Sequence, residues 1–289
     1  MSELKFKHVT KQYGDQAVLK GVDMTWAAGH LYGLLGRNGV GKSTLMRIVN
    51  NRTFATHGSV LLDGTSVVEN EAAQNRIFLM SDAMLYPADR TVAWVFQITK
   101  ALYGDFDDTR AAHLTRVFKL DPNQRLGRLS TGYKTIAKLI VALCVPCDFV
   151  LLDEPVLGLD APFREQFYQE LLATYTERPR TFVIATHLIE EIATLIDHVF
   201  VLADGRITLD EDTESLMAKG RVVSGPAGLV RDYLSGVNVL RTRSMGGMLT
   251  AYTLDAPLET PLPAGVTLEG MDLQRLFIEL TAEVGTDED

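Results

Sequence analysis

LYGLLGRNGVGKSTLMRIVN, residues 31–50 of the chain, is an apolar run followed by a glycine-rich loop and then a segment compatible with a helix. The loop Gly36–Ser43 matches the pattern G-x-x-x-x-G-K-[ST] and falls between a predicted strand and a predicted helix. In such a loop, glycines let backbone N–H groups turn towards phosphate oxygens, and the helix N-terminus adds a partial positive charge. The segment therefore predicts a site for a nucleotide phosphate group.

Two side chains of this loop carry the predicted chemistry. Lys42 is expected to reach the terminal phosphates, and the Ser43 hydroxyl is expected to hold Mg²⁺. The alternative is a glycine-rich turn that only caps a helix, and the flanking strand and helix make that alternative weaker. The residues predicted to bind the nucleotide here are Gly36, Arg37, Asn38, Gly39, Val40, Gly41, Lys42, Ser43 and Thr44.

A second apolar run, residues 149–152, ends in two acidic residues, Asp153 and Glu154. At the end of a buried strand, Asp153 is expected to enter the shell of the metal ion. Glu154, one residue further on, is expected to orient or deprotonate a water that attacks the γ-phosphate. An isolated acidic pair after a strand is usually a helix cap or a solvated turn, but the phosphate loop favours the catalytic interpretation.

The order of elements predicts an α/β fold. Short apolar runs without alternation, separated by helical patterns, indicate strands buried on both faces of a parallel sheet. From about Gln74 to Ala142 the pattern is mainly helical and suggests an insertion. After a turn at residues 203–206 the composition changes, which predicts a boundary near residue 210. The predicted strands are residues 31–35, 149–152, 181–185, 199–202, 237–240 and 248–254, and the predicted helices include 43–50, 163–175 and 273–280.

Composition excludes several classes of protein. The 289 residues include 46% hydrophobic residues, which is typical of globular proteins and argues against disorder. The net charge of −9 argues against a surface that binds nucleic acid, and residues 211–289 carry 13 of the 37 acidic residues but only 6 of the 28 basic ones. Cys144 and Cys147 lack the further cysteines of a zinc site, so a structural role is expected. Neither a targeting segment nor a membrane span is predicted.

The motifs occur in the order found in the nucleotide-binding subunits of ATP-binding-cassette (ABC) transporters, and residues 2–210 resemble that family. Leu129–Tyr133 (LSTGY) is similar to the family signature LSGGQ, Gly158–Asp160 to the loop that communicates across the dimer, and His187 to the switch histidine. Tyr13 stands where the family places a ring that stacks on adenine. The signature residues expected to contact ATP held by the opposite subunit are Ser130, Thr131, Gly132 and Tyr133.

The resemblance also implies a fold and a set of catalytic residues. The fold is a P-loop ATPase core with a mixed sheet, an antiparallel β subdomain and a helical insertion at about residues 82–145. Residues 211–289 form a small α/β accessory region. The residues with an implied catalytic role are Lys42, Glu154 and His187, with Mg²⁺ held by Ser43, Asp153 and Asp82.

Three departures from the family pattern stand out. Asp82 occupies the position where the family usually has a glutamine, and a carboxylate there can accept a hydrogen bond from a metal-bound water. Thr131 and Tyr133 replace the glycine and glutamine of the signature, as in antibiotic-exporter or peptide-exporter subunits. Val156 and Leu157 replace small polar residues after the Glu-Pro pair, which is expected to alter contacts across the dimer.

The function implied by the resemblance is an ATPase subunit that dimerises around two ATP molecules, with Mg²⁺, and drives a separate transmembrane permease. The partners are that permease and a second ATPase subunit, identical or different, with no nucleic acid. The expected substrates are antibiotic-like, peptide-like or lipid-like compounds that are exported, and the expected place is the cytoplasmic face of the membrane. The permease is expected to contact residues 82–87 and the insertion beyond. The alternative is a soluble ABC-type ATPase or a regulatory nucleotide-binding module without a permease.

Overall fold

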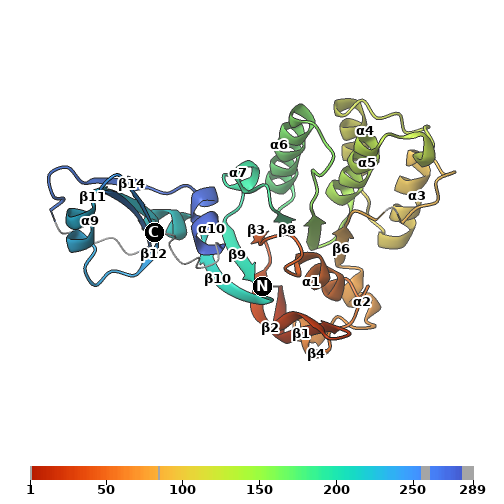
Figure 1. Cartoon of the computed structure of the whole chain (residues 1–289). Helices are drawn as coiled ribbons and strands as arrows, with labels where there is room; N and C mark the ends of the chain where they lie inside the picture. The colour runs from red at the N-terminus through yellow and green to blue at the C-terminus, as the bar shows by residue number, and fades with distance from the viewer. Residues whose placement is uncertain (1, 84, 255–260, 282–289) are drawn as a thin grey trace. The chain divides into compact units, whose positions relative to one another are not determined.

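The computed structural model describes residues 2–83, 85–254 and 261–281. The chain divides into two compact units, Met1–Ile196 with Phe200–Asp210, and Asp197–Val199 with Glu211–Asp289 (Figure 1). Parts of the predicted acidic region, residues 255–260 and 282–289, lie outside the described residues, as does Met84 of the predicted permease contact.

A six-stranded sheet forms the centre of the first unit, with the strand order β10-β9-β3-β8-β7-β6. Strands β3, β8, β7 and β6 run parallel. Every residue of these four strands is buried, which agrees with their continuous apolar sequences. The bounds are β3 Leu31–Leu35, β6 Ile77–Met80, β7 Phe149–Asp153, β8 Thr181–Thr186, β9 His198–Ala203 and β10 Arg206–Asp212.

A second, antiparallel sheet has the order β2-β1-β4-β5. Its long strands alternate buried and exposed residues, so one face is available to pack on a core. Phe6 and Trp26 are buried there with ring centroids 4.7 Å apart, in one cluster with Leu34 of β3 and Leu45 of α1. The shared cluster joins the two sheets. The bounds are β1 Glu3–Tyr13, β2 Gln16–Ala27, β4 His57–Leu62 and β5 Thr65–Ser66.

Helices surround the central sheet, and α3, α4 and α5 gather at one end of the unit, beyond β6 (Figure 1). Three of the longer helices begin with a side-chain cap, in which Thr91, Ser130 or Asp160 accepts a hydrogen bond from a backbone N–H three residues later. The bounds are α1 Lys42–Val49, α2 Glu71–Gln74, α3 Val92–Tyr103, α4 Asp108–Val117, α5 Thr131–Cys144, α6 Ala161–Glu177 and α7 Ile189–Ile192, with a short 3₁₀ turn at Leu126–Arg128.

The mainly helical interpretation of residues 74–142 is wrong at its start. Ile77–Met80 forms β6, which pairs in parallel with β7 from Ile77 opposite Phe149 to Met80 opposite Leu152. A four-residue apolar run has no periodicity that separates a strand from a buried helix, so its neighbour in the sheet decides the structure. The structure therefore places Ser81 and Asp82 directly after a strand, at the same edge of the sheet as Asp153.

The second unit is a smaller α/β unit. Its four strands have the order β12-β13-β11-β14, and β12 and β13 pair in antiparallel fashion across a turn at Gly246 and Gly247. One apolar cluster contains Val223 of β11, Val230 of α9 and Leu249 of β13. The bounds are β11 Arg221–Pro226, β12 Val239–Met245, β13 Met248–Thr253, β14 Thr267–Gly270, α8 Thr213–Lys219, α9 Ala227–Tyr233 and α10 Leu273–Thr281.

No helix in the described ranges combines the length and hydrophobicity that crossing a bilayer requires.

Candidate nucleotide site

The glycine-rich loop connects β3 to α1, and two of its glycines are required by the geometry. Gly41 precedes α1 with φ +117, a conformation that side chains rarely adopt. A Cβ on Gly36 would lie 2.6 Å from the carbonyl oxygen of Leu202 on β9. The loop can therefore lie close against the sheet only because these positions are glycine.

Lys42 is buried inside this loop, with 6% of its side chain exposed. Its ammonium donates to the carbonyl oxygen of Gly36 at 2.6 Å and to that of Arg37 at 3.3 Å. Burial lowers the Lys42 pKa, and the carboxylates of Glu154 and Asp153 partly oppose this change. A desolvated cation held mainly by neutral carbonyls is incompletely neutralised, so a phosphate group fits this site.

Ser43 and Asp153 meet at the edge of the sheet, although they are far apart in the sequence. The Ser43 hydroxyl donates to Asp153 Oδ1 at 2.9 Å. Burial raises the pKa of Asp153, and this hydrogen bond opposes the rise. One hydroxyl and one carboxylate oxygen are ligands that Mg²⁺ prefers, so the pair fits a magnesium ion.

Glu154 is held by two residues at the carboxyl end of β8, Thr186 and His187. His187 Nδ1 lies 3.0 Å from Glu154 Oε2, and the Thr186 hydroxyl donates to the same oxygen at 3.1 Å. Lys42 Nζ lies 4.0 Å from Glu154 Oε1. The backbone of Glu154 is in the left-handed region, with φ 48. The structure thus brings together Lys42, Glu154 and His187, the three residues predicted to act in catalysis.

The signature-like segment begins α5, with Ser130 as its N-cap, and the Ser130 side chain accepts from the backbone N–H of Tyr133 at 3.3 Å. Gly132 lies close to the 158–160 loop, because a Cβ on it would be 3.4 Å from the carbonyl oxygen of Gly158. A cavity of about 200 Å³ is lined by this segment and by the two carboxylates of the site, among them Thr131, Gly158, Asp153 and Glu154.

Asp82 and Tyr13, which were predicted to contact the metal ion and adenine, lie next to basic side chains in the structure. The Asp82 carboxylate is 75% exposed and lies 3.8 Å from Arg47 Nη2, while the Ser43 hydroxyl bonds Asp153 instead. Tyr13 is about half exposed, and Lys11 Nζ lies 4.7 Å from the centre of its ring. The roles of Asp82 at a metal ion and of Tyr13 at adenine stay predictions.

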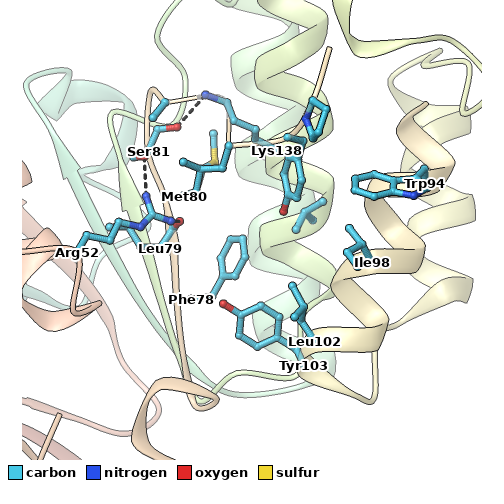
Figure 2. Close-up of a pocket in the computed structure, with 15 residues that line it drawn as sticks. Arg52, Phe78, Leu79, Met80, Ser81, Trp94, Ile98, Leu102, Tyr103 and Lys138 are labelled. Carbon is cyan, nitrogen blue, oxygen red and sulfur yellow. Dashed lines mark hydrogen bonds between the residues drawn. The ribbon is translucent and has the colours of Figure 1, made fainter. Parts of the chain in front are cut away.

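Two cations that the sequence analysis did not single out hold the segment that follows β6 (Figure 2). The ammonium of Lys138, on α5, donates to the carbonyl oxygen of Ser81 at 2.8 Å. It also donates to the carbonyl oxygen of Asp82 at 3.0 Å. Arg52 donates to the Ser81 hydroxyl at 3.1 Å and to the carbonyl oxygen of Leu79 at 3.2 Å. A lysine between the apolar residues of IAKLIVAL is the one signal that points to a buried contact. The segment is thus attached to both α5 and the α1 side of the core.

Residues 19–157 match the family model described as ABC transporter. The chain carries an ABC transporter ATP-binding domain. It is an ATP-binding subunit of the ABC class, and the domain is an ATPase.

Two relatives show how far the similarity to ABC subunits extends along the chain. The ABC transporter ATP-binding protein YtrB of Bacillus subtilis is 29% identical over 213 residues, which cover 74% of this chain and 73% of that protein. Nod factor export ATP-binding protein I of Burkholderia lata is 29% identical over 301 residues, which cover 97% of each chain. The similarity to the second relative therefore includes the C-terminal unit.

The fold of the ABC domain also matches solved structures. A dimeric ATP-binding cassette in a post-hydrolysis state, bound to ADP and Pi, superimposes with a TM-score of 0.65 at 22% identity. The match covers 73% of this chain and 98% of that one. It confirms the predicted ABC-type P-loop fold.

The two cysteines of the ABC domain lie outside the nucleotide site. Cys144 is the last residue of α5, and both thiols are free and buried. Burial raises the pKa of each thiol to about 12. In the described ranges, no three or more His, Cys, Asp or Glu side chains gather in a group that could hold a metal ion.

We expect both thiols to be unreactive in the folded protein. A thiol whose pKa is raised stays protonated as the pH increases, and only the thiolate attacks disulfide reagents. Labelling with a chromogenic disulfide at pH 8 should therefore modify neither cysteine until denaturant is added, after which both should react. Rapid labelling of the native protein would contradict the burial of the pair.

Proposed function

We propose that the chain binds and hydrolyses ATP as one subunit of a dimer that encloses two ATP molecules and drives a separate transmembrane permease. The observation that carries this proposal is the arrangement at Glu154. A carboxylate fixed by His187 and Thr186 lies 4.0 Å from the phosphate-loop lysine, beside the Ser43–Asp153 pair. This arrangement fits hydrolysis of a phosphate anhydride, since the chemistry depends mainly on positioning and charge.

In the proposed reaction each residue has one task. Lys42 and the N–H groups of the loop bind the phosphates of the substrate, and Ser43 with Asp153 would hold Mg²⁺. The magnesium ion supplies charge neutralisation for the phosphate oxygens. Glu154 orients the attacking water and takes its proton, while His187 and Thr186 keep the Glu154 carboxylate in place. Ser130, Thr131, Gly132 and Tyr133 contact the ATP of the second subunit.

The contact with the permease is proposed at the groove between β6 and the helical insertion (Figure 2). A cavity of about 360 Å³ is lined there mainly by apolar and aromatic side chains, including Phe78, Trp94 and Tyr103. Leu85 and Leu102 at this groove are 63% and 64% exposed. Such exposed apolar residues are typical of a binding surface, and a short helix of the permease is the proposed occupant.

Leu102→Glu is expected to prevent co-purification of the permease while basal ATP hydrolysis continues. The charge would enter an apolar contact, and Leu102 does not line the cavity that contains Glu154. The measurement is detergent extraction of the tagged chain from its host, followed by identification of multi-span membrane proteins that elute with it. Val68→Glu, at an exposed apolar position outside the groove, is the matched control and should retain the partner. A stable complex with ribosomes, and no membrane protein, would contradict the transporter function.

Export is proposed because a relative that aligns with both units is named a Nod factor export protein. Cells that carry only a hydrolysis-deficient chain should then retain more of an antibiotic-like or lipid-like substrate than cells with the parental chain. Lower retention would indicate uptake instead.

A further inference from the structure

Helices α6 and α7 both begin directly after loops of the catalytic site. α6 follows Asp160, which caps it, and α7 begins two residues after His187. The two helices line a common cavity of about 340 Å³ that does not include the nucleotide-site residues. A contact between their first turns would therefore connect the 158–160 loop with the switch histidine.

Such a contact is formed by Arg164 and Glu191. Arg164 Nη1 lies 2.5 Å from Glu191 Oε1, and the side chains are only 28% and 29% exposed. Each residue lies four positions after a loop residue of the site, Arg164 after Asp160 and Glu191 after His187. Four residues are about one helical turn, so the ion pair joins the two helices near their catalytic ends.

The surroundings make this ion pair the main polar link at that point. Arg164 Nε, Glu191 Oε2 and the Tyr168 hydroxyl are buried, and none has a hydrogen bond of good geometry within the described residues. Burial raises the pKa of Tyr168, and the nearby Glu191 carboxylate raises it further. Separating a charge pair that is partly desolvated and has few other hydrogen bonds is costly in free energy, because each charge is then left without a partner.

Few other contacts fix the orientation of α7. It is four residues long, and its buried side chains are Ile189 and Ile192. The backbone N–H of Leu188 donates to the Thr186 hydroxyl at 3.0 Å, and that hydroxyl donates to Glu154. A shift of α7 would therefore move His187 and disturb Thr186, the two groups that hold the Glu154 carboxylate.

We propose that Arg164 and Glu191 are positioning residues for ATP hydrolysis, whose ion pair holds α7 so that His187 keeps Glu154 in place. The proposal rests on the hydrolytic function proposed above. It assigns no contact with ATP to either residue, so their removal affects the hydrolysis step and not nucleotide binding.

The test is steady-state ATP hydrolysis by the purified full chain. Glu191→Gln and Arg164→Met should each lower kcat about tenfold with KM within about twofold of the parental value, because a small displacement of catalytic groups slows chemistry. The double variant Arg164→Glu with Glu191→Arg, which exchanges the charges, should restore kcat to within about threefold of the parental value. Glu177→Gln, at the far end of α6 where Glu177 pairs with Arg110, is the control and should leave both constants unchanged.

The outcomes separate the two proposals. A parental chain that does not hydrolyse ATP, or a Glu154→Gln variant that does so at the parental rate, would overturn the hydrolytic function. If both of those behave as expected, a parental kcat in the single variants overturns the positioning role. A higher KM with unchanged kcat overturns it too, as does a charge exchange that folds but stays as slow as the single variants. Thermal unfolding of every variant identifies any that fail to fold. If Arg164→Met does not fold, Arg164→Lys replaces it. Lysine keeps the charge but lacks the planar guanidinium, so this variant should give an intermediate kcat.

Discussion

Glu154→Gln is expected to reduce ATP hydrolysis by roughly 10² to 10⁴-fold, the usual contribution of a general base. The amide has nearly the same shape and can still accept the hydrogen bond that Thr186 donates to this side chain, but it cannot take a proton from water. The phosphate loop is unchanged, and removal of one negative charge 4.0 Å from Lys42 reduces repulsion of the phosphates. ATP binding should therefore persist or become tighter.

Three measurements check this expectation. Release of inorganic phosphate gives the rate, titration with a fluorescent ATP analogue gives the affinity, and size-exclusion chromatography with light scattering shows whether ATP traps a dimer. The control is Glu165→Gln, which removes an exposed carboxylate of α6 that bonds Gln169 within its own helix, and it should keep the parental rate. Parental hydrolysis by Glu154→Gln would show that another group activates the water.

Lys42→Met is expected to weaken ATP binding by at least about tenfold, and by up to about a hundredfold. A hydrogen bond to a charged group contributes about 1.5–3 kcal/mol, and each 1.4 kcal/mol corresponds to a factor of ten in affinity. The substitution should not lower the stability of the folded protein. Burial lowers the pKa of Lys42, so the folded state bears a cost for this charge, and an apolar side chain of similar length removes that cost.

Isothermal titration with ATP and a thermal unfolding curve without nucleotide together test this prediction. Loss of affinity with an unchanged or higher Tm supports the role of Lys42 at the phosphates. Lys100→Met, which removes an exposed ammonium that pairs with Asp108, should change neither quantity. If ATP affinity were retained without the Lys42 ammonium, the phosphate site would have to lie elsewhere.

The parts of the site that could be predicted are those specified by local sequence and by one rule of sheet geometry. The strand, glycine loop and helix around Lys42 lie within twenty residues, so their order is visible directly. Asp153 and His187 follow apolar strands, and the carboxyl ends of parallel strands meet at one edge of the sheet. The rule places these residues together without any knowledge of their distances.

The contacts that the sequence did not predict depend on packing between segments that are distant in the sequence. Lys138 reaches Ser81 across 57 residues, and Arg164 reaches Glu191 across 27. A lysine or arginine on a helix is usually a solvated side chain, and only the position of the neighbouring element shows otherwise. β6 was missed for the same reason, because the strand is defined by its pairing with β7 and not by its own four residues.

The left-handed backbone of Glu154 has a consequence for how this protein tolerates change. A residue with a side chain held at φ 48 carries an unfavourable conformation worth on the order of 1–3 kcal/mol. Glycine would relieve that cost, so selection for stability alone would favour replacing Glu154 with glycine, which removes the carboxylate. Variants selected only for heat resistance should therefore tend to lose the Glu154 carboxylate, and with it ATP hydrolysis.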